Sequence, residues 1–230
     1  MIDLSKLGYP NVKQMYLFDF TPGQGGDFFI TLASKCSSEF VHSWENTQQM
    51  LTRVAEFQKT TRMPGNNIGG KLIYHDSVSK YQQQILQDLQ QKRGDLGTKI
   101  SFCTHPTGSN LNTRISDVLV QCFPGLPLQR VALSIKSDTS RRFAEYHYGY
   151  ATDVVQNTQA PDSRFILWED PVNTIELDPI DLLVNDPEEL KRQVLRISSD
   201  INWQWYDHVV AVYRKIKIDP FVEWYKQEKK

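Results

Sequence analysis

The sequence has no surplus of charge of either sign. Its 230 residues include 26 lysines and arginines and 27 aspartates and glutamates, which gives a net charge of −1. Proteins that bind nucleic acid without regard to its sequence usually carry a strong positive excess. We therefore expect no nucleic-acid partner.

A long apolar run is also missing. A helix that spans a membrane needs about 18 to 20 consecutive apolar residues, and the sequence contains no such run. The first residues, MIDLSKLGYP, lack the apolar centre of a signal peptide. These absences predict no membrane association and an intracellular or cytoplasmic location where the protein is made.

Cysteines are few, and metal-binding patterns are missing. Cys36, Cys103 and Cys122 are odd in number and stand at unrelated spacings, so they fit neither a disulfide framework nor a zinc site. No His-x-x-x-His pattern and no pair of carboxylates stands out. We expect the cysteines to be small core residues and the protein to bind no metal.

The most informative stretch that is present is residues 13–37, KQMYLFDFTPGQGGDFFITLASKCS, which has the order strand, glycine turn, helix. Residues 15–18 form a short apolar run of the kind found in buried strands of parallel sheets. The glycines at 23, 25 and 26 free the backbone for a tight turn. Because the first N–H groups of a helix have no partner inside the helix, such a turn can hold an anion. The alternative is a turn that only connects the two elements, since the Gly-Lys-Ser/Thr ending of a Walker A loop is missing.

Helix-like and strand-like segments alternate along the rest of the chain. Apolar periodicity predicts helices at residues 45–58, 76–92, 114–122, 139–155, 187–200, 206–218 and 220–229, and strands at residues 99–104, 130–135, 165–168 and 174–177. The glycine-rich segment 61–70 is expected to be a lid or contact loop. The alternation predicts a three-layer α/β fold with a mostly parallel sheet flanked by helices. We expect this domain to cover residues 1–202 and an aromatic helical tail to cover residues 203–230, packed on the domain or on a partner.

Three strand ends are expected to converge on one crevice, because ligands of parallel sheets bind at the carboxyl ends of the strands. These ends are residues 21–27, 104–105 and 136–138. In this frame the chain resembles the sulfotransferase family, whose fold is similar to that of P-loop NTPases. Residues 22–28 stand where the family has a Pro-Lys-Ser-Gly-Thr-Thr-Trp loop, and residues 103–106 resemble its Lys-Thr-His-Leu-Pro strand end.

Two further stretches carry the resemblance, which covers most of residues 13–202. Lys136 and Ala144 stand at the places of a strand-end Arg and a Ser that hold the 3′-phosphate of the donor nucleotide, and residues 180–190 resemble the family's closing strand-to-helix passage. An active member would use 3′-phosphoadenosine 5′-phosphosulfate (PAPS) as the donor of a sulfuryl group to an acceptor hydroxyl. The resemblance then implies His105 as general base, a 5′-phosphosulfate site at Gly23, Gln24, Gly25 and Gly26, and a 3′-phosphate site at Lys136 and Arg141.

The sequence departs from the family pattern where the donor would bind. Gly23 replaces the loop Lys, Gly26 and Asp27 replace the two hydroxyl residues, and Ala144 replaces the Ser. Sulfuryl transfer places negative charge on oxygen, which a loop cation normally stabilises. A carboxylate about 4 Å from a phosphate costs about 4 kcal/mol at an effective dielectric near 20. We therefore predict a non-catalytic structural or interaction protein that binds no cofactor, with the active PAPS-dependent enzyme as the alternative.

The aromatic tail is a candidate contact surface, because Trp and Tyr dominate protein interfaces. We expect protein partners or self-assembly, and a tail that packs only on its own domain is the alternative. The assembly could be a phage or virus particle, which would place the protein in the virion. The predicted interface residues are Trp203, Trp205, Tyr206, Trp224 and Tyr225.

Overall fold

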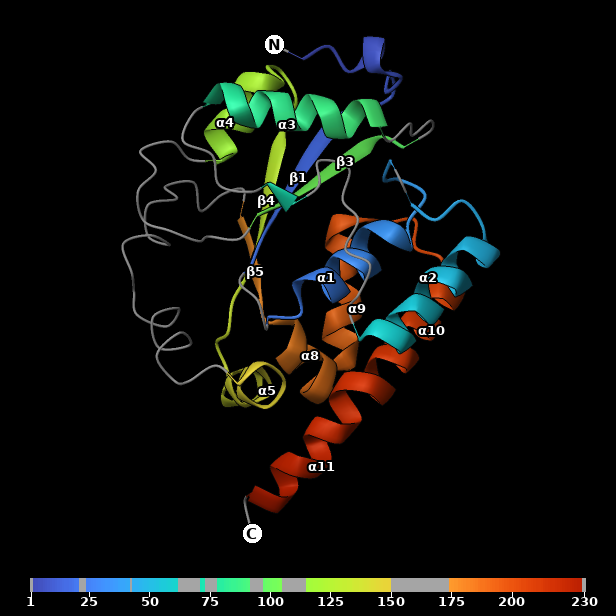
Figure 1. Ribbon diagram of the computed structural model, residues 1–230, viewed down its shortest axis with the longest axis vertical. Coiled ribbons are helices and arrows are strands. Elements are labelled where there is room, and N and C mark those ends of the chain that lie inside the picture. The colour runs from blue at the N-terminus through green and yellow to red at the C-terminus, as the bar shows by residue number, and fades with distance from the viewer. Residues whose placement is uncertain are drawn as a thin grey trace.

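A parallel β-sheet forms the centre of the computed structural model, which describes residues 2–20, 24–41, 43–61, 71–72, 78–91, 97–104, 115–149 and 174–228 (Figure 1). The strand order is β2-β3-β1-β4-β5, and every neighbouring pair is parallel. The strands are β1 (Gln14–Asp19), β3 (Lys99–Thr104), β4 (Leu128–Leu133), β5 (Thr174–Leu177) and the two-residue edge strand β2 (Lys71–Leu72). The predicted α/β class with a parallel sheet is confirmed.

Strand β1 is covered on both edges and on both faces. It pairs with β3 on one edge and with β4 on the other, so that Phe18 lies beside Cys103 and Val131. Met15 and Leu17 belong to one apolar cluster, whereas Tyr16 and Phe18 belong to the other. Because β1 is buried on both faces, its sequence is a continuous apolar run rather than an alternating one.

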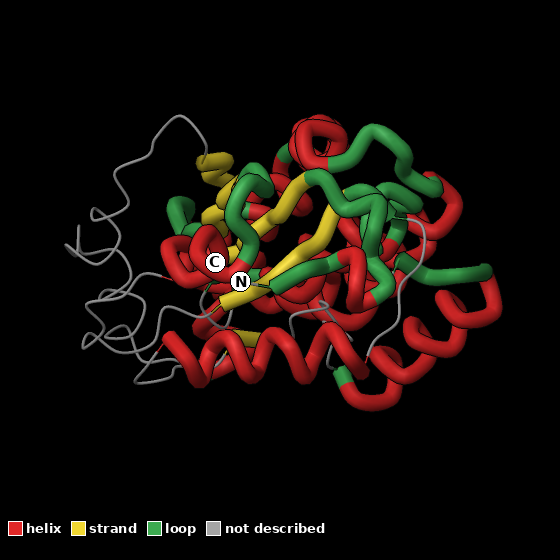
Figure 2. Tube along the Cα trace, turned by 90° about the horizontal axis from the view of Figure 1, so that it is seen from above, coloured by secondary structure: helices red, strands yellow, loops and turns green. Residues whose placement is uncertain are grey.

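Helices lie on both sides of the strands (Figure 2). On the face of Met15 and Leu17, helices α3 (Val78–Gln91) and α4 (Ile115–Cys122) pack together with the amino-terminal segment and its 3-10 helix η1 (Ser5–Leu7). The opposite face is covered by α1 (Gly26–Ile30), the π-helix η2 (Thr31–Lys35), α2 (Thr47–Thr60), α8 (Pro179–Asn185), α9 (Pro187–Ile197) and α10 (Trp203–Tyr213). The sheet therefore has a helical layer on each face, as a three-layer α/β fold requires.

The carboxyl-terminal tail is one nearly continuous helical rod. Helix α10 is followed directly by the π-helix η4 (Arg214–Ile218) and by α11 (Asp219–Glu228), which runs past α5 to the end of the molecule farthest from α3 and α4 (Figure 1). The tail packs on the α/β unit, because the Tyr213 ring stacks on Phe28 at a centroid distance of 4.0 Å. Farther along, His147 of α5 donates from Nε2 to the Lys217 carbonyl oxygen, at 2.7 Å.

Two predicted helices are shorter in the structure. Helix α5 (Asp138–Tyr148) ends well before residue 155, because Gly149 adopts a left-handed conformation with φ of +58° and its N–H bonds to the Glu145 carbonyl oxygen. This is a common glycine ending for a helix. Helix α9 ends at Ile197, where Ser198 turns to extended backbone. The predicted strand at 165–168 and the predicted contact loop at 61–70 fall outside the described residues, apart from Thr61, which follows α2.

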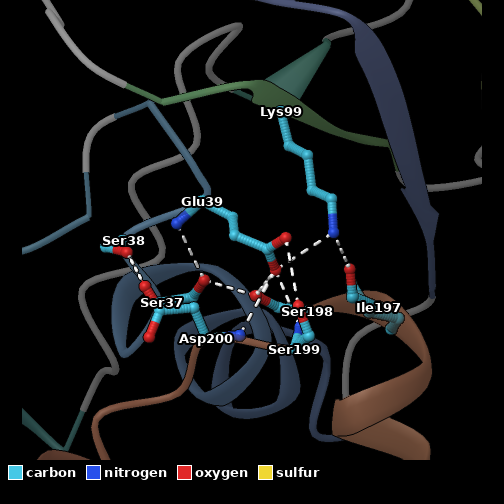
Figure 3. A network of polar contacts seen from close by, with 8 residues as sticks. All are labelled: Ser37, Ser38, Glu39, Lys99, Ile197, Ser198, Ser199 and Asp200. Atoms are coloured by element: carbon cyan, nitrogen blue, oxygen red, sulfur yellow. Dashed lines mark hydrogen bonds and ion pairs between the residues drawn. The ribbon is translucent and has the colours of Figure 1, made fainter.

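A polar network centred on Glu39 fixes the position of α9 (Figure 3). Lys99, the first residue of β3, donates from Nζ to Glu39 Oε2 at 3.1 Å and to the Ile197 carbonyl oxygen at 2.8 Å. The backbone N–H of Ser199 donates to the same carboxylate at 2.7 Å, and the Ser198 hydroxyl is in close contact with it. One carboxylate thus joins the amino end of a central strand to the carboxyl end of a helix.

This network predicts an acid-sensitive contribution to stability. Burial disfavours the Glu39 charge, but hydrogen bonds from Ser198 and Lys99 and the Lys99 charge outweigh it and lower the pKa of Glu39 from 4.5 to about 2. A carboxylate whose pKa is lower in the folded state stabilises the protein above the unfolded pKa, here by about 3 kcal/mol. That contribution should disappear as the pH falls from about 4.5 to about 2.

Urea unfolding of the wild type and of Glu39→Gln between pH 7 and pH 2 checks this. The two proteins should differ most at pH 7 and converge at low pH. Glu56→Gln is the control, because Glu56 pairs with Arg53 on the exposed surface of α2. A difference between wild type and Glu39→Gln that does not change with pH would contradict the prediction.

Candidate functional site

The carboxyl edge of the sheet is the candidate site, since all described strands end there in the same direction. Strand β1 leads through Asp19 and Phe20 to the glycine turn, β4 leads to residues 134–138, and β5 leads to Asp178. Of the predicted site residues, His105 and Gly23 lie outside the described residues. Gln24, Gly25, Gly26, Lys136 and Arg141 are described, and each is placed below.

The chain's own apolar side chains fill the space beside the two described glycines. A Cβ atom added to Gly26 would lie 2.0 Å from Cδ2 of Phe20, and one added to Gly25 would lie 2.7 Å from Cδ1 of Ile180. Phe20 is 3% exposed and Ile180 is fully buried. Both glycines therefore give room to a core side chain of this protein, which is a packing role.

Neither of the two polar residues beside these glycines supplies a positive charge for an anion. Gln24 is buried at 2% exposure, and Asp27 is exposed in the first turn of α1. A carboxylate in the first turn already supplies the negative charge that a helix amino terminus favours. The Asp27 charge also acts on Tyr213: burial raises the pKa of Tyr213 well above 10, and the nearby Tyr148 and Asp27 raise it further.

The two cations predicted to hold a 3′-phosphate each have a carboxylate partner. Lys136 Nζ lies 2.6 Å from Glu176 Oε2, and both side chains are exposed. The Arg141 guanidinium is in close contact with the Asp138 carboxylate. An incoming phosphate would have to compete with these partners for both cations.

Asp178 is a hydrogen-bond centre that the sequence analysis missed. Its Oδ2 accepts from the backbone N–H groups of Lys136 at 3.0 Å and Ser137 at 3.3 Å, and from the Ser137 hydroxyl at 3.3 Å. Its Oδ1 accepts from the backbone N–H of Asp181 at 3.2 Å and from the Ser140 hydroxyl in a close contact. The Asp-Pro pair that predicts the start of α9 also occurs at 178–179, and this signal could have identified the residue as a helix cap.

Asp19 and Arg130 form a buried ion pair at the end of β1, which was also missed. Arg130 donates to Asp19 Oδ2 from Nη2 at 2.5 Å and from Nε at 3.2 Å. Burial raises the pKa of Asp19, and the attraction of Arg130 offsets only part of this effect. Asp19 Oδ1 is buried and makes no hydrogen bond within the part of the chain that the structure describes. An acid within an otherwise apolar strand was the available signal.

The predicted interface residues do not form one surface. Trp203 is 39% exposed, whereas the Tyr206 ring beside it is buried in the core at 2% exposure. Trp205 is half-buried and donates from Nε1 to the Thr47 hydroxyl of α2, at 3.3 Å. These three aromatic side chains belong to the start of α10, and of them Trp203 has the most contact with solvent.

The other two predicted interface residues belong to α11 and pack on α5. The Trp224 ring lies 5.1 Å from the Tyr146 ring. The Tyr225 hydroxyl donates to Asp138 Oδ2 at 2.8 Å. Both residues are half-buried, so this part of the tail is held by its own domain.

Metal-ion and thiol sites are not visible in the described ranges. No group of three His, Cys, Asp or Glu residues there could hold a metal ion, and none of the described helices is long and apolar enough to cross a membrane. Cys36 is buried, and burial raises the pKa of its thiol, so the reactive thiolate is disfavoured.

Comparisons of the chain with protein-family models, with curated proteins and with solved structures give no match. The resemblance to sulfotransferases thus rests on the motifs described above.

A matched pair of glycine substitutions tests the packing role of the turn. Gly25 and Gly149 both have left-handed backbone, with φ of +68° and +58°, but no atom lies within 4 Å of a Cβ added at Gly149. Alanine at either position should cost about 1 to 2 kcal/mol of backbone strain. Gly25→Ala should cost about 1 to 3 kcal/mol more, because it crowds Ile180.

Urea unfolding of both variants measures this difference in the free energy of unfolding. Adding Ile180→Ala to Gly25→Ala should remove most of the extra cost, because the smaller side chain leaves room for the new methyl group. Equal losses for Gly25→Ala and Gly149→Ala would contradict the packing role.

Proposed function

We propose that this protein is a non-catalytic interaction protein on a sulfotransferase-like α/β fold, and a component of a larger protein assembly. The observation that carries the proposal is the pairing of the two cations that a donor would need, Lys136 with Glu176 and Arg141 with Asp138. Phe20 and Ile180 pack where Cβ atoms of residues 26 and 25 would lie, so these two glycines have a packing role of their own. The function is therefore binding through the surface of the molecule rather than transfer chemistry at this edge.

The charges at the strand ends also disfavour an anionic donor. Lys136 and Arg141 are neutralised by Glu176 and Asp138. Asp178 adds a further carboxylate to the same edge. The 3′-phosphate of the donor nucleotide would therefore lie close to carboxylates at this edge. Like charges at close range repel by several kcal/mol.

The partner surface that we propose is the start of α10. Trp203 is the most exposed of the predicted interface residues, and its ring rests edge-on against Tyr206 at a centroid distance of 5.2 Å. An exposed Trp that packs on a buried ring can form the centre of a protein interface. The partner is another protein or a second copy of this chain, in an assembly for which a phage or virus particle stays a prediction.

The alternative function is an active PAPS-dependent sulfotransferase with His105 as general base. It is favoured only by the order of the motifs along the sequence. It needs the donor to bind at the turn after β1 and at Lys136, and binding can be measured without knowledge of the acceptor.

Titration calorimetry with 3′-phosphoadenosine 5′-phosphate distinguishes the two functions. We expect no heat of binding at millimolar ligand, because Lys136 and Arg141 are paired with carboxylates. Lys136→Ala is the control that identifies the predicted site. Micromolar binding by the wild type that is lost in Lys136→Ala would reject the non-catalytic proposal in favour of the enzyme.

Sedimentation velocity tests self-assembly through the proposed surface. We expect the wild type to associate with increasing concentration and Trp203→Ala to stay monomeric with an unchanged melting temperature, since an exposed side chain contributes little to folding. Leu195→Ala is the matched control, because Leu195 is 43% exposed on α9. A wild type that stays monomeric at all concentrations would exclude self-assembly and leave only a heterologous partner.

A further inference from the structure

The strands β1 and β4 lie side by side in the sheet, but the chain leaves them in opposite directions. After β1 it passes through α1 and α2 to β2 at one end of the strand order, and after β4 it passes through α5 to β5 at the other end (Figure 1). Ligands of open α/β sheets bind beyond the carboxyl ends of the strands at such a reversal. The topology therefore favours a ligand between the ends of β1 and β4.

Both of these strand ends carry a buried polar atom that makes no hydrogen bond within the part of the chain that the structure describes. At the end of β1 this atom is Asp19 Oδ1, and just beyond β4 it is the hydroxyl oxygen of Ser134. The whole Asp19 residue is only 1% exposed. Buried polar groups nearly always have a partner, because an unpaired one costs stability. Two such atoms at the reversal of the strand order are an observation that does not depend on the sulfotransferase motifs.

The two atoms belong to the same face of the sheet. Asp19 is in register with Ala132 of β4, and Ser134 follows Ala132 by two residues. The Ser134 N–H donates to the Leu177 carbonyl oxygen at 3.0 Å, so the pairing of β4 with β5 continues to this residue. Residues two apart on an extended strand share a face, and this diagonal spans about 8 Å, so one small molecule can contact both atoms. Ala132, between them on β4, contributes only a methyl group.

The charges at this place favour a neutral ligand. Asp19 Oδ2 accepts from Nε and Nη2 of Arg130, so the buried pair has no net charge. A charged ligand would bring an uncompensated charge into a buried place, which is unfavourable. The free carboxylate oxygen can only accept a hydrogen bond, whereas the Ser134 hydroxyl can donate or accept. The ligand group that matches is a neutral N–H or O–H donor, as in a polyhydroxyl compound or an amide.

We infer that the ends of β1 and β4 form a binding site for a small neutral molecule, which donates a hydrogen bond to Asp19 Oδ1 and contacts the Ser134 hydroxyl. The protein keeps two polar atoms that weaken its fold, because they serve this binding. The site differs in chemistry from the phosphate sites that the sulfotransferase resemblance implies. The inference goes beyond the proposed interaction function and does not depend on it.

Removal of the Ser134 hydroxyl separates a binding role from a structural one. Ser134→Ala should leave the folding equilibrium constant unchanged within about twofold or raise it, because no hydrogen bond is lost. Ser34→Ala is the matched control: the buried Ser34 hydroxyl donates to the Ile30 carbonyl oxygen at 2.8 Å, and its removal should lower the constant on the order of fivefold. Urea unfolding measures both constants. Equal losses in the two variants would overturn the inference.

Two neutral probes test binding to the full-length protein by ¹⁵N NMR. Myo-inositol supplies O–H donors and acetamide supplies N–H donors, each at about 100 mM because molecules with few atoms bind weakly. At least one of them should shift the backbone amide signals of Phe20 and Ser134, and Ser134→Ala should weaken its binding fivefold or more. Thr52→Ala, which removes an exposed hydroxyl on α2, should bind as the wild type does.

A double variant removes the other hydrogen-bonding partner. Asp19→Leu combined with Arg130→Met leaves neither charge of the pair buried alone, and it should abolish the shifts at Ser134. Sodium phosphate should cause no shift there beyond that of sodium chloride at equal ionic strength. The inference is rejected if neither neutral probe shifts these signals, if the shifts persist in both site variants, or if phosphate alone produces them.

Discussion

The close packing of Phe20 on Gly26 determines where α1 can start at the carboxyl edge of the sheet. β1 is the middle strand of the sheet and has a helical layer on each face, and Phe20 is the first residue beyond it. The Phe20 ring occupies the position that a side chain at residue 26 would need, and α1 can start only where a glycine allows this. The start of α1 and the position of Ile180 over Gly25 both depend on close packing at these glycines.

Several polar groups at the same edge are paired with other groups of the protein. Lys136 is paired with Glu176, Arg141 with Asp138, and the open N–H groups of the β4–α5 turn with Asp178. Satisfied donors give no gain in free energy when a ligand arrives, because the ligand must first replace an existing partner. An edge whose polar groups are already paired within the protein offers an incoming ligand fewer free hydrogen-bonding groups. For this reason we propose recognition at the exposed Trp203 side chain, at the start of α10.

The fold was largely predictable from the sequence, since its elements are specified by local pattern. β3 and β5 have the predicted bounds, and the apolar run of β1 corresponds to a strand buried on both faces. The predicted length of α5 was wrong because Gly149 ends the helix through its left-handed backbone. The contents of the site were less predictable. Arg130 meets Asp19 across 111 residues of sequence, and Phe20 meets Gly26 by the turn of the chain in space. From the sequence alone, the glycines at 25 and 26 could make room either for a ligand or for a side chain of the protein, such as the Phe20 ring.

The π-helix η4 determines which side of α11 faces the rest of the protein. The buried residues of α10 are Tyr206, Val209, Val212 and Tyr213, and the next fully buried residue of the tail is Ile218, five positions after Tyr213. A π-helical turn carries one residue more than an α-helical turn and so shifts the buried stripe by about 100°. Without it, Phe221 and Tyr225 would face away from α5. The number of residues between Tyr213 and Ile218 should therefore be fixed, because loss of one position would turn the whole of α11 away from its seat. This constraint on length adds to constraints on composition, since Arg214 donates to the Leu183 carbonyl oxygen and Ile216 packs against the core.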